Sequence, residues 1–134
     1  MDMASKILVI GGVLNLVLAV VTGFFLATQR LSNSKAHHFL VVSHTSPLMQ
    51  GPLLLGMVFA VQLSPLSGIW ETVAAWMLVV SALFQAITNI LNWRLDIHDE
   101  FQDKPPHGVV FGLASAALFT AGTGILVVGV WKGM

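Results

Sequence analysis

Long runs of apolar residues alternate with short polar segments along the whole chain. A helix needs about 20 mostly apolar residues to cross the hydrocarbon core of a bilayer, and four runs reach that length. We predict membrane-spanning helices over residues 7–28, 38–63, 69–93 and 108–131. The pattern therefore predicts an all-α, antiparallel four-helix bundle that forms a single transmembrane domain over residues 1–134.

The three polar connections differ in character. Residues 29–37 are polar and basic, and residues 64–68 (SPLSG) are short enough for a tight turn. Residues 94–107 carry most of the acid in the chain, and two prolines at their end are typical of a helix start. Tryptophans fall at predicted helix ends, as in an interfacial aromatic belt, at Trp70, Trp93 and Trp131.

The basic residues indicate a membrane orientation. More of them lie in the first and third connections than beside the termini, which favours a cytoplasmic position for those connections and an external position for both termini. The two groups are Arg30, Lys35, Arg94 and Lys104 against Lys6 and Lys132.

Composition agrees with a membrane protein. Of 134 residues, 56% are hydrophobic and only 9% are charged, with a mean hydropathy of +0.85. The formal net charge is zero, so nothing indicates a nucleic-acid partner or a polybasic lipid patch. The absence of cysteine excludes disulfides, zinc–thiolate sites and iron–sulfur clusters. Because only Lys6 precedes the first apolar run, we expect a retained span instead of a signal peptide, in a bacterial inner membrane.

The third predicted helix carries a polar stripe. Its members are spaced so that they share one helical face, and most of them crowd into the last turns. Amides and hydroxyls of this kind can simply join membrane helices, or they can line a site. The stripe consists of Ser81, Gln85, Thr88, Asn89 and Asn92.

His44 is the single histidine deep within a predicted span, since His38 lies at the mouth of the second helix. It lies six residues inside the second helix, about 9 Å along the axis. The hairpin of the second and third helices should bring His44 and Gln50 to the depth of the polar stripe. We therefore expect one polar pocket, open toward the first and third connections, that contains all of these residues.

Two prolines modify the second helix close to His44. Pro47 and Pro52 each lack a backbone donor and so free the carbonyls of Ser43 and Leu48. With Gly51 between them, a kink around residues 47–52 is expected. Kinks at membrane depth are tolerated where protein covers them or where they line a cavity.

An ionisable residue inside a span is a candidate functional residue. His44 could form only an interhelical hydrogen bond, or it could carry protons or bind a metal. No Asp or Glu lies within a predicted span, since Glu71 is at a helix end, and a bare metal site needs three or four ligands. One deep histidine suits a five-coordinate haem with an open face.

The run HTSPLMQG, from His44 to Gly51, resembles the second helix of the styrene oxide isomerase family. Both show histidine, two residues, proline, two residues, an amide and glycine. The resemblance implies a homotrimer that binds ferric haem b at subunit contacts and isomerises lipophilic aryl epoxides to aldehydes. It implies His44 as the axial iron ligand and Gln50 at the distal site. We further expect cofactor contacts from Ser43, Pro47 and Gln85, and the expected catalytic residues are Gln50, Asn89, Asn92 and Trp93.

Two departures from the family pattern concern the reaction. Gln50 stands where the family has asparagine, and the chain has no tyrosine to replace a functional tyrosine late in the third helix. Either Asn89 or Trp93 takes that position, depending on the alignment. Haem binding by His44 therefore transfers to this chain more directly than the epoxide reaction does.

We expect a haem b-dependent epoxide isomerase, with a haem-binding accessory subunit of a larger membrane complex as the alternative. A scaffold without cofactor is a third hypothesis. The expected partners are a small lipophilic substrate, membrane lipid and further copies of the chain, and no nucleic acid. Small residues on the first and last helices would permit close subunit approach, namely Gly11, Gly12, Asn15, Ala19, Gly108, Gly112, Ser115 and Ala116.

Overall fold

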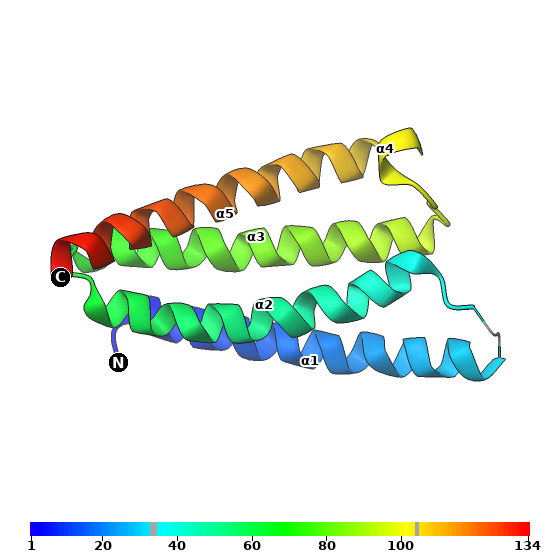
Figure 1. The fold of residues 1–134 in the computed structure, drawn as a ribbon, viewed down its shortest axis with the longest axis horizontal. Coiled ribbons are helices and arrows are strands. Elements are labelled where there is room, and N and C mark those ends of the chain that lie inside the picture. The colour runs from blue at the N-terminus through cyan, green and yellow to red at the C-terminus, as the bar shows by residue number, and fades with distance from the viewer. Residues whose placement is uncertain (33–34, 104) are drawn as a thin grey trace.

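The computed structural model describes residues 1–32, 35–103 and 105–134, without the side chains of Glu100 and Phe101. Four long helices dominate these residues, and no strand occurs among them (Figure 1). Each of the four is long and apolar enough to cross a membrane. They are α1 (Met3–Ser32), α2 (His38–Leu63), α3 (Gly68–Arg94) and α5 (Pro106–Gly133). The four predicted spans therefore correspond to four helices, of which α1 is longer than predicted.

Local chemistry explains where the helices begin and end. His37 caps α2, because its side chain accepts a hydrogen bond from the backbone N–H of Phe39. Pro105 caps α5 and Pro106 is its first residue. Proline is tolerated there because the first N–H groups of a helix have no acceptor within the helix. One turn of helix, α4 (Glu100–Asp103), interrupts the third connection. The sequence pattern gave no sign of α4.

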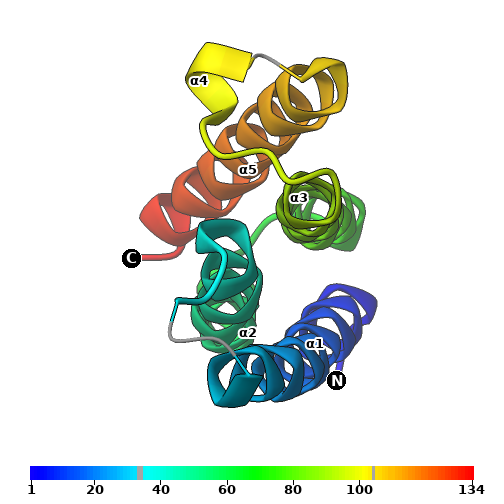
Figure 2. The ribbon, with the colours of Figure 1, turned by 90° about the vertical axis from the view of Figure 1, so that its right-hand side faces the viewer.

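The helices associate as two tight pairs. The most extensive contacts join α1 to α2 and α3 to α5, while α3 also contacts both α1 and α2. Contact between α2 and α5 is much thinner. The end-on view shows α3 beside α5 on one side and the α1–α2 pair on the other (Figure 2). Both chain ends lie at the same end of the long helices (Figure 1).

Small residues allow α1 to approach its neighbours. A Cβ built on Gly12 would lie 3.0 Å from the carbonyl oxygen of Gly51, so the α1 and α2 backbones nearly touch there. Gly11 faces Val79 of α3 equally closely, and Asn15 is buried. Ala19 is buried as well. The small residues predicted to serve subunit contacts on α1 instead pack inside one chain.

The outer surface is mostly apolar, as lipid contact requires. Large side chains such as Val20 (73% exposed), Phe24 (68%) and Phe59 (69%) point outward. Polar side chains are concentrated inside the helix contacts or at the end that carries the first and third connections. This inversion of the usual pattern leaves interhelical polar groups as the candidates for function.

Candidate functional site

The His44 side chain lies against α1. Its Nδ1 is 2.7 Å from the carbonyl oxygen of Ala19. A carbonyl oxygen only accepts hydrogen bonds, so Nδ1 must be the donor and carry the proton in the neutral ring. The lone pair of the imidazole is therefore on Nε2.

Gly23 provides the space for this arrangement. A Cβ at position 23 would lie 2.8 Å from both Cε1 and Nδ1 of His44. Any side chain there would push the ring away from the Ala19 carbonyl, one helical turn earlier on α1. The glycine thus belongs to the His44 site, although its position in the sequence gives no indication of that.

Pro47 has a defined consequence one turn before it. Because proline has no N–H, the carbonyl of Ser43 lacks its normal partner within α2. The hydroxyl of Thr22 on α1 lies 3.0 Å from that oxygen, and it shares its one proton between that oxygen and the Leu18 carbonyl of its own helix at 2.8 Å. The Ser43 hydroxyl donates to the carbonyl of Phe39 at 2.6 Å. Ser43 and Pro47, predicted to contact a cofactor, are both buried, and the Ser43 carbonyl contacts α1.

A cavity of about 670 Å³ lies between α2, α3 and α5. This volume is within the range that holds small organic ligands. Its wall is mainly apolar, from residues that include Met49, Leu53 and Phe119. The described lining residues include no acid, base or histidine. The polar groups on the wall are Thr45, Ser46, Gln50, Ser81, Gln85 and Ser115.

Two glutamines supply unused hydrogen-bonding capacity beside this cavity. The amide nitrogen of Gln50 lies 3.3 Å from the Ser46 hydroxyl, whereas its Oε1 is buried without a partner. The amide nitrogen of Gln85 lies 3.3 Å from Oδ1 of Asn89, whose own Nδ2 is buried and unpartnered. Because Gln50 and Gln85 line the cavity, their amides are the groups that a polar ligand atom would meet there, once Gln50 Oε1 turns out of its buried position.

Other members of the polar stripe join helices. Ser81 and Ser115 exchange hydrogen bonds between α3 and α5, with the Ser81 hydroxyl 2.8 Å from the Ser115 carbonyl. Asn92 is fully buried, and its Oδ1 lies 2.8 Å from Nε2 of His107 on α5. Thr88 donates to the Phe84 carbonyl of its own helix. The interhelical or local bonds account for the hydroxyls and for Oδ1 of Asn92, whereas Nδ2 of Asn92 is buried without a partner among the described residues.

Trp93 lies at the end of α3 and away from the cavity. Its ring is 6.1 Å from that of Phe25 on α1, and the Arg94 guanidinium lies over it at 5.3 Å. This position is typical of an interfacial tryptophan. Its contacts are with neighbouring side chains at the membrane boundary.

The structure separates the predicted pocket into two places. Gln50 and Gln85 line the cavity, whereas His44 does not. The His44 ring packs on α1, and its Nε2 is neither hydrogen-bonded to a described residue nor among the enclosed unpartnered atoms. His44 is partly exposed, so part of its ring reaches the surface of the chain. The expectation of one pocket holding His44, Gln50, Gln85 and the late α3 amides is wrong for a single chain.

Sequence reasoning missed the groups that position His44 and part of the cavity wall. Ala19 contributes its backbone carbonyl, and Gly23 contributes space because it has no side chain. Neither residue type is polar, so the sequence pattern did not single them out. Ser46 and Thr45 follow His44 in the same run, and their placement on the cavity side follows from the 100° step per residue.

No family model, no curated protein and no solved structure matches this chain.

Proposed function

We propose that this protein binds haem b through His44 and isomerises lipophilic epoxides to carbonyl compounds in the membrane. The observation that carries the proposal is the hydrogen bond from His44 Nδ1 to the Ala19 carbonyl. Haem-ligating and metal-ligating histidines commonly donate their second ring nitrogen to a carbonyl in this way, which fixes the tautomer and makes the free nitrogen more basic.

The surroundings of His44 suit a porphyrin. His44 is partly exposed, and nearby positions in the sequences of α1 and α2 carry exposed apolar side chains, Val20, Phe24 and Leu48. A flat hydrophobic macrocycle would cover such side chains and remove them from lipid or from a partner. The donor set is one neutral imidazole, which is the proximal ligand of a five-coordinate haem.

We propose assembly as a homotrimer, which the partly exposed position of His44 permits. A haem held there would extend beyond the chain, so another copy would have to cover it. In a trimer, the α2–α5 side of a neighbouring chain would supply that cover and bring its cavity, with Gln50, toward the haem of the first chain.

Ferric haem held by His44 would supply a Lewis acid for the oxygen of an epoxide, whose isomerisation to a carbonyl compound needs no oxidant or reductant. The protein's own residues would do the rest. Gln50 and Gln85 would orient the epoxide and donate hydrogen bonds as negative charge develops on oxygen. The apolar wall would exclude water and so favour rearrangement over hydrolysis. We place the protein in a bacterial inner membrane, with its helices antiparallel and the first and third connections cytoplasmic.

A haem-binding protein or accessory subunit without isomerase activity is the second candidate. It is favoured by the described cavity wall, which offers no titratable side chain for acid–base chemistry. A cofactor-free scaffold is the third candidate, in which the His44–Ala19 hydrogen bond only joins α1 to α2.

Absorption spectroscopy tests the haem proposal. Protein purified in detergent after haem supplementation should show a Soret band, and His44→Ala should lose it. The matched control is His38→Ala, which removes an exposed histidine at the start of the same helix. No band in the wild type, or an unchanged band in His44→Ala, would refute haem ligation by His44.

Two further measurements separate the remaining possibilities. Native mass spectrometry that finds only haem-loaded monomers would refute the trimer. Aryl epoxide turnover by the haem-loaded protein distinguishes an isomerase from an accessory subunit, and a stoichiometric larger partner in the purified material would favour the latter.

A further inference from the structure

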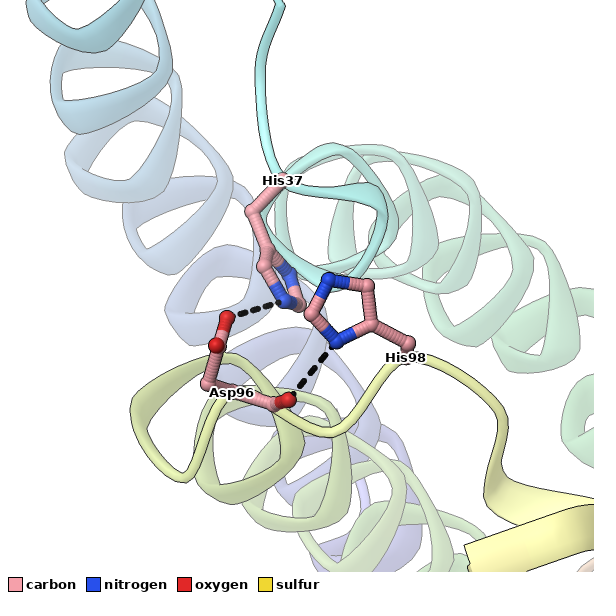
Figure 3. Close-up of side chains that lie close together, drawn as sticks. All are labelled: His37, Asp96 and His98. Carbon is pink, nitrogen blue, oxygen red and sulfur yellow. Dashed lines mark hydrogen bonds and ion pairs between the residues drawn. The ribbon is translucent and has the colours of Figure 1, made fainter.

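Two connections meet at the end of the molecule that lies opposite the chain termini. His37 caps α2, while Asp96 and His98 follow α3. One ligand atom from each of these three side chains lies within 4.8 Å of the others. Figure 3 shows the carboxylate of Asp96 and both imidazoles converging on one space.

The backbone holds Asp96 and His98 in this arrangement. Asp96 has φ 54°, the left-handed region that few residues other than glycine adopt, although Asp and Asn tolerate it. Nδ1 of His98 lies 2.9 Å from the Asp96 carbonyl, so this nitrogen donates and Nε2 keeps the lone pair. Such an unusual backbone conformation often marks a binding site.

His37 contributes the most enclosed group. Its side chain is 13% exposed, and its Nε2 lies 3.2 Å from Oδ1 of Asp96. That nitrogen is buried and lacks a hydrogen bond of good geometry, whereas Nδ1 accepts from the N–H of Phe39 at 3.2 Å. Metal binding at Nε2 would move the ring proton to Nδ1 and release the Phe39 N–H. The ring stays neutral overall.

We propose that His37, Asp96 and His98 bind one divalent first-row metal ion, with Zn²⁺ the best match. Two imidazole nitrogens and one carboxylate oxygen are a preferred zinc donor set, and water can complete four-coordination. Calcium and magnesium favour all-oxygen sites. An adjoining pocket of about 330 Å³, lined in part by Gln29, Lys35 and His38, has room for that water.

The ion would connect the segment before α2 to the segment after α3. These segments adjoin α2 and α3, and both helices line the large cavity. Val42, the first α2 residue in the cavity wall, lies one turn beyond His38. The positive charge of Lys35 would repel a bound cation, and the negative charge of Asp96 would offset that repulsion. The site uses none of the residues assigned to haem or substrate, so its test is independent of the proposed function.

Isothermal titration calorimetry with Zn²⁺ tests the site, on chelator-treated full-length protein without a polyhistidine tag. The wild type should bind one ion per chain. His98→Ala and Asp96→Asn should each weaken binding by 100-fold or more. Asparagine tolerates the backbone conformation of position 96, so that variant should remain folded. His38→Ala, in the same pocket but outside the cluster, should stay within threefold of the wild type.

A second measurement distinguishes loss of metal binding from misfolding of a variant. The cysteine-free background allows spin labels at Lys35→Cys and Gln102→Cys, and Zn²⁺ should narrow the distance distribution between them. Asp96→Gly, which suits the positive φ, should abolish that narrowing while retaining helical circular dichroism. Absence of Zn²⁺ binding by the wild type at 100 µM, or equal affinity in wild type, His98→Ala and Asp96→Asn, would overturn the proposal.

Discussion

The imidazole of His44 occupies the space that a side chain on Gly23 would need, since a Cβ there would lie 2.8 Å from Cε1 and Nδ1. We expect Gly23→Ala to displace the ring while leaving the helices intact, because the obstructing group is a side chain that can rotate away. Haem retained after purification should fall by about tenfold or more. The haem-to-protein absorbance ratio measures this effect.

Gly56→Ala is the matched control for that substitution. It lies on α2, and a Cβ there meets nothing within 4 Å. Equal haem loss in both variants, or full haem content in Gly23→Ala, would contradict the role assigned to Gly23.

The hydrogen bond from Thr22 to the Ser43 carbonyl should stabilise the chain only because Pro47 leaves that carbonyl free. Thr22→Val should lower the free energy of unfolding by about 0.6–1.7 kcal/mol, the range for interhelical hydrogen bonds in membranes. In a Pro47→Ala background, residue 47 regains its N–H and the same change should have a smaller effect. Reversible unfolding in mixed micelles gives the double-mutant cycle, and strict additivity would argue against this coupling.

Gln50→Leu should change ligand behaviour more than stability. The substitution removes the amide whose Oε1 is buried and unpartnered beside the cavity. We expect turnover of an aryl epoxide, or binding of an imidazole probe to ferric haem, to change by about tenfold or more. Met49→Leu is the control, because it alters the cavity wall without removing a polar group.

Asn89→Leu should also change epoxide turnover or imidazole binding. It removes the acceptor of the hydrogen bond from the Gln85 amide, so Gln85 would lose its fixed position at the cavity. If Gln50→Leu or Asn89→Leu instead loses haem or dissociates in detergent, without a selective effect on ligand, that residue is structural.

Gly12 and Gly112 should respond in opposite ways to leucine. Gly12→Leu would force α1 away from the Gly51 carbonyl and should destabilise the chain by about 1–3 kcal/mol or more. Gly112→Leu meets open space and projects into the cavity, so it should preserve stability while blocking ligand binding. Unfolding midpoints and ligand titrations compare the two. A stable Gly12→Leu chain that only loses its trimer would show that α1 packs between subunits.

Asp2 should make the first turn of α1 sensitive to acid. The Ser5 backbone N–H donates to its carboxylate at 2.7 Å, and this hydrogen bond lowers the Asp2 pKa. A lowered pKa in the folded state means that the stabilisation is present at neutral pH and is lost as the pH falls below about 4. Amide exchange of this turn should therefore speed up in acid. Asp2→Asn keeps an acceptor without the titration, so its exchange should lack that step.

The sequence by itself determined the four long helices and most of their ends. The bilayer core offers no water to hydrogen-bond the backbone N–H and C=O groups. A run of about 20 apolar residues that crosses it therefore forms a helix, in which these groups bond to one another within the segment. It also determined that Ser43 would need a partner, since Pro47 lacks a donor, and that Gln50 and Gln85 would lie at similar depth. Both glutamines do line one cavity.

Only the tertiary structure decided which way each polar side chain faces. The hydropathy of α2 hardly varies around its axis, so the pattern could not show that His44 turns to α1 while Gln50 lines the cavity between α2, α3 and α5. The side is set by close packing, through Gly23 leaving room for the ring and the Ala19 carbonyl bonding it. Contacts between distant segments, such as His37 with Asp96, depend on how loops fold back over helix ends. Composition and spacing carry no information about that geometry.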